Sequence, residues 1–356
     1  MRAAVLEGIG GPLAVSEVEL EPPRPGELLV RVVAAGVCHS DLSVVDGTRP
    51  RPTPMVLGHE AAGVVEEAPG VDDVAPGDHV VLSFVPSCGV CGECNSGRPA
   101  LCGPAAAANT EGRLVGGGRR LSRGGSEVHH HLGVSAFAER AVVARGSAVV
   151  VPRDVPLEIA ALFGCAVLTG VCAVLETARV RPGESVAVYG LGGVGLSAVM
   201  GAVVAGATPV VAVDPVAAKR ELALELGATH AYAPEEAAER VRDVRHAFEA
   251  VGSARVIEAA YAATGRGGTT VQVGLPHPDE ELRIQAVSLV AGGKSLVGSY
   301  MGSAAPQRDI PRLLALWRAG RLPVEKLRSG ELPLERIGEA MEALAAGSVV
   351  RQTIRP

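Results

Sequence analysis

The pattern of apolar and polar residues along the chain changes near residue 155. Before that point, short apolar stretches are separated by Gly and Pro, and they predict strands at 27–34, 61–66 and 79–82. The opening sequence MRAAVLEGIGG predicts another strand at the start of the chain. Several short strands between turn residues are typical of a compact, barrel-like β domain. The Gly-, Ala- and Arg-rich stretch 103–128 is expected to form an exposed loop.

Beyond residue 155, continuous apolar strands alternate with helical patterns, which is typical of a parallel α/β sheet. The predicted helices cover residues 156–175, 194–205, 217–226, 309–319 and 334–346. The predicted strands lie at or near residues 184–189, 209–213, 247–251, 270–274 and 351–354. A chain of 356 residues with this change of pattern is expected to form two domains.

Composition narrows the class of protein. Hydrophobic residues make up 47% and charged residues 20%, the balance of a globular protein with a sizeable core. The apolar runs are too short or too rich in Gly to span a bilayer, and the N-terminus lacks a signal-peptide apolar region, so we expect a cytoplasmic protein with no membrane partner. The net charge is −6 and the scattered basic residues form no stripe, so nucleic acid is not an expected partner.

Four of the seven cysteines are clustered in the first domain. The spacing Cys88-x2-Cys91-x2-Cys94-x7-Cys102 suits a closed tetrahedral zinc site, which holds a loop and does no chemistry. In a chain without a secretion signal, clustered thiols favour a metal over disulfides. An iron–sulfur cluster also uses four cysteine thiolates and is the main alternative, although the spacing is closer to that of zinc loops.

A glycine motif, GLGGVG at 190–195, follows a predicted strand and opens a predicted helix. Gly190 permits a tight turn, Gly192 lets the backbone approach a pyrophosphate, and Gly195 allows close packing of helix on strand. The helix N-terminus would face the phosphates. The next strand ends at Asp214, nineteen residues after Gly195, where a carboxylate can accept hydrogen bonds from both adenosine ribose hydroxyls. Its charge would repel a 2′-phosphate, which predicts NAD rather than NADP.

A second potential metal site is dispersed along the chain. Cys38, His59 and Cys165 together offer two thiolates and one imidazole. Three protein ligands leave zinc a fourth position for water or substrate, which is the catalytic arrangement. Asp41 and Glu60 lie next to these residues in sequence, and carboxylates there suit supporting roles behind the ligands.

These motifs, in this order, resemble those of the zinc-dependent alcohol dehydrogenases of the medium-chain dehydrogenase/reductase superfamily. The motifs that carry the resemblance are CHSD at 38–41, GHE-x2-G at 58–63, the four-cysteine lobe, FGC at 163–165, GLGGVG at 190–195 and Arg351 near the end. The resemblance implies an α/β protein with a Rossmann coenzyme domain, containing a doubly wound parallel sheet, and a GroES-like β-barrel catalytic domain. The implied boundaries are 1–166 for the first catalytic segment, with the structural zinc lobe at 86–103, 167–299 for the Rossmann NAD-binding domain and 300–356 for the second catalytic segment.

The resemblance also implies roles for individual residues. Cys38, His59 and Cys165 would hold the catalytic zinc. Asp41 would orient His59, and Glu60 would lie behind the metal. The implied coenzyme site consists of His39, Thr169, Gly190, Gly192, Gly193, Val194, Gly195, Asp214, Lys219, Val273 and Arg351.

Ser40 would hydrogen-bond the substrate oxygen and pass its proton outward. Many relatives end this proton relay with a His where this chain has Ser43, so either Ser43 and water complete the relay or the proton leaves by another route. The implied substrate channel is lined by Phe84, His131, Leu132 and Tyr300, with Arg49 near its mouth. His131 replaces an aromatic residue of the family.

The implied reaction is hydride transfer between a primary alcohol, hydrophobic or aromatic, and NAD+, reversible with the aldehyde. Two Zn²⁺ per chain and NAD would be its cofactors, and a homodimer, or alternatively a tetramer, its assembly. Two alternatives of the same family are a thiol-adduct-dependent formaldehyde dehydrogenase and a nicotinoprotein alcohol/aldehyde dismutase. A zinc-free quinone or enoyl reductase and a non-catalytic redox sensor are disfavoured by the complete ligand set and by Ser40.

Overall fold

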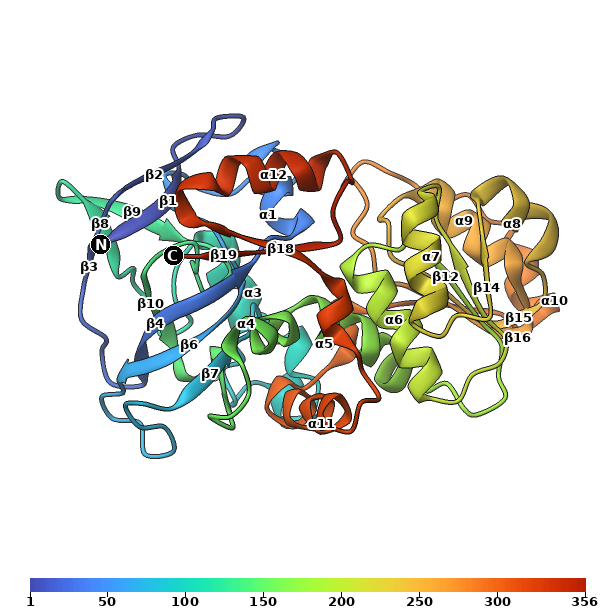
Figure 1. The fold of residues 1–356 in the computed structure, drawn as a ribbon, viewed down its shortest axis with the longest axis horizontal. Helices are drawn as coiled ribbons and strands as arrows, with labels where there is room; N and C mark the ends of the chain where they lie inside the picture. Colours follow the sequence, from blue (N-terminus) through green and yellow to red (C-terminus); the bar gives the residue numbers. More distant parts are fainter. The chain divides into compact units, whose positions relative to one another are not determined.

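Strand β4 (Glu27–Gly36) is the longest strand of the N-terminal unit and pairs with three others in its larger sheet (Figure 1). The computed structural model describes residues 1–356 and divides into two compact units. Unit 1 consists of Met1–Cys165, Ala305–Pro311 and Arg328–Pro356, so the chain leaves it and returns to it. Unit 2 consists of Ala166–Ala304 and Arg312–Leu327.

Unit 1 contains two β-sheets. The larger has the strand order β11-β7-β6-β4-β19-β18, with β10 also paired to β4, and only β18 and β19 run parallel. Its other strands are β6 (Glu60–Glu67), β7 (His79–Leu82), β10 (Arg140–Ala144), β11 (Ala148–Val151), β18 (Arg328–Pro333) and β19 (Arg351–Arg355). The smaller sheet has the order β2-β1-β5-β9-β8-β3. Its strands are β1 (Arg2–Leu6), β2 (Leu13–Glu17), β3 (Glu19–Leu20), β5 (Met55–Val56), β8 (Leu121–Arg123) and β9 (Ser126–His130).

Two helices close one side of this unit and lie side by side, α1 (His39–Val45) and α12 (Ile337–Ala345) (Figure 1). The buried residues of α12 are Ile337, Ala340, Met341 and Leu344, a spacing that places all four on one helical face. They join the same apolar core as the inner side chains of β4, so the returning C-terminal segment completes the first unit. The remaining helices of unit 1 are α2 (Gly92–Asn95), α3 (Gly103–Glu111) and α4 (Leu157–Ala160), and α11 (Pro306–Arg318) is divided between the units.

The prediction of an exposed loop over 103–128 is wrong. Helix α3 begins this stretch and the hairpin of β8 and β9 ends it. Ala105, Ala108 and Asn109 are buried on one face of α3, and Gly112 ends the helix with a left-handed φ of 64°. Alanine has the highest helix propensity, and its small side chain packs closely, so the alanines of this stretch form a helix. The prediction of a loop relied on the turn-forming residues and overlooked this propensity.

Unit 2 is built on a six-stranded parallel sheet with the order β14-β13-β12-β15-β16-β17. Counted from β12 this is 3-2-1-4-5-6, the order of doubly wound dinucleotide-binding domains. The strands are β12 (Val186–Tyr189), β13 (Val210–Val213), β14 (His230–Tyr232), β15 (Val244–Glu249), β16 (Thr264–Gln272) and β17 (Ser295–Gly298). Helices α6 (Gly193–Val204) and α7 (Ala217–Glu225) lie on one face of the sheet, and α9 (Ala254–Ala263) and α10 (Ala286–Gly292) on the other (Figure 1). The short α8 (Pro234–Arg240) connects β14 to β15.

The predicted helix over 156–175 is not continuous. It consists of α4, a 3-10 turn at Ala161–Gly164, α5 (Ala166–Cys172) and a π-helical turn at Ala173–Ala178. The break falls at Cys165, whose φ of −142° and ψ of −77° are not helical. The apolar pattern runs through the break without interruption, so the sequence pattern could not show it.

We also compared each helix with the length and apolar composition needed to cross a membrane. No helix meets both requirements by itself. The segments Leu157–Gly164 and Ala166–Ala178 meet them only when they are taken together as a bent pair.

Candidate active site

Cys38 lies between the end of β4 at Gly36 and the start of helix α1 at His39. It adopts an extended conformation as the N-cap residue, with φ −131° and ψ 153°. Its backbone N–H donates to Asp41 Oδ2 at 3.2 Å. A helix N-terminus leaves backbone N–H groups without helical partners, and Asp41 in the first turn satisfies one of them. The side chains of Cys38 and Asp41 are therefore fixed by the start of the same helix.

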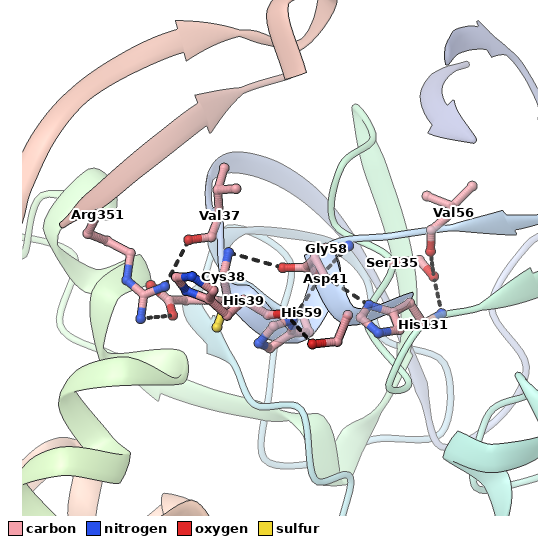
Figure 2. Close-up of polar contacts among 12 residues, drawn as sticks. Val37, Cys38, His39, Asp41, Val56, Gly58, His59, His131, Ser135 and Arg351 are labelled. Carbon is pink, nitrogen blue, oxygen red and sulfur yellow. Dashed lines mark hydrogen bonds and ion pairs between the residues drawn. The ribbon is translucent and has the colours of Figure 1, made fainter. Parts of the chain in front are cut away.

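His59 is brought to the same place by the turn between β5 and β6. Gly58 has φ +92°, and a Cβ atom on it would lie 2.6 Å from the backbone N of Phe137, so only glycine fits this turn. The Gly58 N–H donates to Asp41 Oδ1 at 3.1 Å, and His59 Nδ1 lies 3.0 Å from the same oxygen (Figure 2). A carboxylate oxygen accepts hydrogen bonds, so Nδ1 carries the proton and Nε2 is the lone-pair nitrogen available to a metal.

Cys165 completes a buried cluster with these two residues. One potential ligand atom from each of Cys38, His59 and Cys165 lies within 4.8 Å of the others, and all three residues are buried. The break in the helix falls at Cys165, directly after the 3-10 turn Ala161–Gly164, which contacts β6. Three residues from distant parts of the sequence therefore converge in unit 1.

The charges in this cluster are strongly coupled. The hydrogen bond from Cys165 holds the pKa of the Cys38 thiol well below its usual value, with Arg351 and His59 adding to the effect. The same hydrogen bond and burial raise the pKa of Cys165. Burial on its own would lower the pKa of His59, but the Asp41 carboxylate and the Cys38 sulfur raise it well above its usual value. Protons therefore remain on the Cys165 thiol and on Nε2 of His59, and a metal that binds both sulfurs and this nitrogen must displace them.

The donor set fits zinc. Two sulfurs and one imidazole nitrogen are ligands that zinc accepts, and a set of three leaves a further coordination position. Asp41 accepts a hydrogen bond from Nδ1 of His59, which leaves Nε2 for the metal. A carboxylate in this position is common behind metal-binding histidines. Burial on its own would raise the pKa of Asp41, but the charge of His59 and hydrogen bonding from His131 and His59 lower it to about 2, so the carboxylate is ionised at neutral pH.

Glu60 and Arg351 lie on another side of the cluster. Arg351 is buried, its Nη1 donates to the Val37 carbonyl at 2.8 Å, and its Nη2 lies 3.6 Å from Glu60 Oε2 (Figure 2). Burial on its own would lower the pKa of Arg351, but Glu60 and the two sulfurs raise it. A Cβ atom on Gly36 would lie 2.3 Å from Glu60 Oε1, so that glycine makes room for the carboxylate. The guanidinium therefore offsets negative charge around the thiols.

The first turn of α1 also presents His39 and Ser40, next to Cys38 in the sequence. His39 is exposed and Ser40 is half-buried. The Ser40 hydroxyl makes no hydrogen bond within the chain, so it is available to a ligand. The Ser43 hydroxyl, one turn later, donates to the backbone carbonyl of His39 at 2.8 Å. The proton of Ser43 is therefore already engaged with the backbone.

Two of the predicted channel residues, Phe84 and His131, contact the ring of His59. The Phe84 ring meets the His59 ring edge-on at 5.5 Å between centroids, and the His131 ring does so at 5.6 Å. Leu132 follows His131 in a turn and is 8% exposed. Arg49 is half-buried in the segment after α1. Tyr300 belongs to unit 2 and is 40% exposed.

The four remaining clustered cysteines form a separate site in unit 1. Potential ligand atoms of Cys88, Cys91, Cys94 and Cys102 all lie within 4.8 Å of one another, and none forms a disulfide. Backbone N–H groups point at the sulfurs, from Cys91 to Cys88 Sγ at 3.3 Å and from Cys88 to Cys102 Sγ at 3.4 Å. N–H donors favour the thiolate form, and four converging sulfurs with no open position suit a structural zinc.

The glycine motif in unit 2 forms the turn from β12 to α6. Gly190 has φ +89°, and a Cβ atom on Gly195 would lie 1.7 Å from the Gly190 carbonyl oxygen. A Cβ atom on Gly192 would meet nothing within 4 Å, so this glycine borders open space. Gly193 and Val194 begin α6, whose N-terminal N–H groups lack helical acceptors. The turn therefore has the form of a phosphate-binding site.

Asp214 closes this turn at the end of β13. Its Oδ2 accepts the Leu191 N–H at 2.8 Å and its Oδ1 accepts the Val216 N–H at 2.9 Å. Lys219 lies in the first turn of α7, shortly after Asp214. Arg220 donates from Nη1 to the Asp214 carbonyl at 2.7 Å, so its guanidinium is held close to the same segment.

Thr169 and Val273 are the other predicted coenzyme residues of unit 2. Thr169 lies on α5 and is 7% exposed, and its Oγ1 is buried without a hydrogen-bond partner. A buried hydroxyl without a partner is unfavourable in the protein alone, which fits a position where a ligand supplies the partner. Val273 follows β16, and its N–H donates to the Glu249 carbonyl at 2.9 Å.

Comparison with known proteins identifies the family. Residues 24–153 match the family described as "Alcohol dehydrogenase GroES-like domain", and residues 193–318 match the one described as "Zinc-binding dehydrogenase". The chain is 42% identical to the NDMA-dependent alcohol dehydrogenase of Amycolatopsis methanolica, over 99% of this chain and 98% of the relative. It belongs to the zinc-dependent alcohol dehydrogenases of the medium-chain dehydrogenase/reductase superfamily. This alcohol dehydrogenase is thus an oxidoreductase that acts on small-molecule alcohols or aldehydes.

Two further relatives agree with this membership. Geraniol dehydrogenase of Castellaniella defragrans is 40% identical to this alcohol dehydrogenase, over 99% of this chain and 97% of the relative. The crystal structure of benzyl alcohol dehydrogenase from Acinetobacter calcoaceticus superposes with a TM-score of 0.94 at 34% identity, covering 99% of this chain and 98% of that chain. The predicted fold class, a Rossmann domain with a GroES-like β-barrel domain, is confirmed.

Two features of this alcohol dehydrogenase that bear on the site were missed by sequence reasoning. The first is Gly36, which leaves room for the side chain of Glu60. The only indication of this in the sequence is that a glycine ends the strand just before Cys38. The contact between His131 and Asp41, at 3.2 Å from Nδ1 to Oδ1, had no signal at all, because ninety positions separate the two residues.

Proposed function

We propose that this alcohol dehydrogenase oxidises primary alcohols with hydrophobic or aromatic bodies to aldehydes, using NAD+, and that the reaction is reversible. The observation that carries the proposal is the convergence of Cys38, His59 and Cys165 in one buried cluster. Three ligands of this kind are the arrangement that leaves zinc a position for substrate.

Cys38, His59 and Cys165 would hold the catalytic zinc. When bound there, zinc supplies a Lewis acid that lowers the pKa of an alcohol. Asp41 keeps the proton of His59 on Nδ1, which leaves Nε2 as the ligand atom. Glu60 and Arg351 lie behind the cluster and balance its charge. Burial of the three ligands excludes water, which strengthens every electrostatic interaction in the site.

Ser40 is the residue that we assign to the substrate hydroxyl. It lies two positions after Cys38 on α1, and its hydroxyl makes no hydrogen bond within the chain. It can accept the substrate proton while donating its own outward. The Ser43 proton is engaged with the His39 carbonyl, so we propose that the proton leaves through water beside the exposed His39 rather than through Ser43.

The coenzyme proposed for unit 2 is NAD, which supplies the hydride acceptor. The turn at Gly190–Gly195 would bind the pyrophosphate at the N-terminus of α6. Asp214 would accept hydrogen bonds from the adenosine ribose, with Lys219 beside it. Thr169 would contact the nicotinamide and Val273 would offer its backbone to the carboxamide. We also propose His39 and Arg351 as residues that bind coenzyme phosphate.

An apolar substrate follows from the residues around His59. Phe84 and Leu132 offer apolar surface, and we also propose Tyr300 as a residue that contacts the substrate. Each buried methylene stabilises a bound ligand by about 0.8 kcal/mol, so a larger apolar alcohol gains several times that amount over ethanol. Two relatives are named for geraniol and benzyl alcohol, which are primary alcohols with unsaturated apolar bodies. His131 and Arg49 would favour a polar or anionic group at the far end of some substrates.

A second candidate is an enzyme of the same chemistry that retains its NAD through turnover. The Amycolatopsis methanolica relative at 42% identity is named as NDMA-dependent. An alcohol dehydrogenase that depends on such an added compound suggests that the compound is a second substrate, which reoxidises the coenzyme. In that case the bound NADH would transfer its hydride to this compound or to an aldehyde, and it would not be released from the enzyme. The thiol-adduct-dependent formaldehyde dehydrogenase has less support, because Ala106, where such enzymes carry a charged residue, is an exposed alanine on α3.

We further propose a homodimer built through unit 2. β17 is an edge strand of the parallel sheet, with one side unpaired in the monomer. Val287 and Val290, on the neighbouring helix α10, are 68% and 86% exposed. An open sheet edge beside exposed apolar side chains is a surface that proteins usually cover.

The test of the proposal is a panel of ethanol, benzyl alcohol and geraniol with NAD+, followed both by absorbance of free NADH and by aldehyde formed. We expect higher kcat/KM for the two larger alcohols than for ethanol. Free NADH equal to aldehyde supports the first candidate. Aldehyde formed only with an added oxidant such as NDMA, with NAD co-purifying, supports the second. A preference for ethanol contradicts the apolar channel.

A further inference from the structure

The Asp41 carboxylate is approached by two histidines rather than one. Its Oδ1 lies 3.0 Å from His59 Nδ1 and 3.2 Å from His131 Nδ1 (Figure 2). His131 is 1% exposed and Asp41 is fully buried. His131 Nδ1 is buried without a well-aligned hydrogen bond, and the Asp41 carboxylate at 3.2 Å is the charged group that faces it. So short a contact between a ring nitrogen and a carboxylate oxygen is favourable when that nitrogen carries the proton.

The backbone around His131 is shaped to hold the ring in this place. The His131 N–H donates to Ser135 Oγ at 2.8 Å, and that hydroxyl donates to the Val56 carbonyl at 2.9 Å (Figure 2). Leu132, Gly133 and Ser135 all have positive φ, at 52°, 67° and 54°. Left-handed conformations at residues other than glycine are unfavourable and persist where surrounding contacts fix them. The backbone of this turn is therefore constrained, and it holds the His131 ring next to Asp41.

The trio of Asp41, His59 and His131 is better explained as a hydrogen-bonded cluster than as a further metal site. Besides the two imidazoles, the backbone N–H of Gly58 donates to Asp41 Oδ1 at 3.1 Å and that of Cys38 donates to Oδ2 at 3.2 Å. Three hydrogen bonds to this carboxylate and the close contact of His131 compensate its charge, so no cation is needed between these groups.

We propose that His131 is a positioning residue for the catalytic zinc: by holding Asp41 Oδ1, it fixes the carboxylate that keeps His59 in the orientation and tautomer that binds metal. The inference rests on the proposed zinc site of Cys38, His59 and Cys165. It assigns His131 a role besides lining the channel. Partners behind a metal-binding histidine raise its basicity and fix its ring, and loss of such a partner typically lowers metal affinity by 10- to 100-fold, as a rough range.

The experiment compares His131→Leu, which removes the donor, with His131→Asn and His131→Gln. The Asn amide places an N–H close to the position of Nδ1, whereas the Gln amide places it close to Nε2. His129→Leu is the matched control, because this neighbouring histidine accepts a hydrogen bond from Arg119 Nε at 3.0 Å and is not paired with Asp41. The readout is zinc per chain after dialysis against increasing dipicolinate, with the absorption spectrum of Co²⁺ in the catalytic site as a second measure.

We expect wild type, His131→Asn and His129→Leu to keep two zinc ions over the same range of chelator. His131→Leu and His131→Gln should lose one zinc at a chelator concentration about 10-fold lower or more. Their Co²⁺ spectra should differ from that of wild type. If His131→Leu does not fold, the contrast between Asn and Gln gives the same information.

Three results would overturn the inference. Equal chelator resistance in all variants would remove the role of His131 while leaving the proposed zinc site intact. A wild-type protein with zinc only at the four-cysteine site would overturn the proposed function and this inference together. A third ion per chain in wild type that disappears in His131→Asn would make His131 a ligand instead.

Discussion

The carboxylate of Asp214 accepts a hydrogen bond from the backbone N–H of Leu191 at 2.8 Å. This contact joins the end of β13 to the glycine turn after β12, so the residue proposed to select the coenzyme also shapes the turn proposed to bind its phosphates. One side chain therefore combines a structural role with a selective one. A substitution at Asp214 has to be chosen so that the two effects can be separated.

Asp214→Asn should relax the preference for NAD. The amide keeps an acceptor for one backbone N–H but removes the charge, and like charges at contact cost several kcal/mol in a desolvated site. We expect the ratio of kcat/KM for NAD+ to that for NADP+ to be large in wild type and to fall at least about tenfold in the variant, equivalent to about 1.4 kcal/mol. Glu221→Gln removes a nearby exposed charge on α7 and should leave the ratio unchanged. Equal use of both coenzymes by wild type would contradict the assignment of Asp214.

The structural zinc should be separable from catalysis. Cys91→Ala removes one of four sulfurs, and we expect it to lose one zinc per chain and to lower the Tm, because structural zinc contributes folding free energy. Cys172→Ala is the matched control, since this buried cysteine belongs to neither cluster and should leave both zinc ions in place. An unchanged Tm with one zinc lost would contradict the structural role.

His130 should make stability depend on pH. Burial, with Arg120 adding to it, lowers the pKa of His130 to about 3 in the folded protein from the ordinary 6.5. The unfolded chain therefore binds the proton first, so the contribution is complete above pH 6.5 and is lost as the pH falls towards 3. Between pH 7 and 5 the free energy of unfolding should fall by about 2 kcal/mol more in wild type than in His130→Gln.

The Gln variant offers an amide oxygen to the Arg120 N–H, which now donates to His130 Nε2 at 3.0 Å. Chemical denaturation at several pH values measures the difference. Parallel pH profiles for the two proteins would mean that His130 is protonated in the folded state, or that the hairpin of β8 and β9 opens before His130 titrates.

Assembly through unit 2 should depend on α10. Val290→Lys places a charge on a valine that is 86% exposed beside the edge strand β17, and we expect it to shift a dimer towards monomer in sedimentation. Leu224→Lys is the control, because Leu224 is 46% exposed on α7, on the opposite face of the sheet. Dissociation by the control alone would place the interface elsewhere.

The sequence predicted β4, β6 and β7 of unit 1 and β12, β13, β15 and β16 of unit 2, because buried strands leave apolar runs bounded by Gly and Pro. It missed about half of the strands, among them the short β5, β8 and β14. It also predicted both cysteine sets, since thiols and imidazoles at such spacings have few other uses. It failed where small residues pack in a helix, as at Ala105 and Ala108, and where one apolar run contains a break, as at Cys165. The contact of His131 with Asp41 depends on a turn with positive φ values, which tertiary contacts fix and the local pattern does not encode.

In the proposed function, Cys38, His59 and Cys165 hold the metal on which alcohol oxidation depends. The most direct measurement determines zinc per chain and the rate of benzyl alcohol oxidation, with NAD+ and with an added oxidant, in wild type and Cys38→Ser. We expect two zinc ions and turnover in wild type, and one zinc, a nearly unchanged Tm and no turnover in the variant. A variant that keeps both zinc ions and its activity, or a wild type that oxidises alcohol with zinc only at the four-cysteine site, would contradict the proposed function.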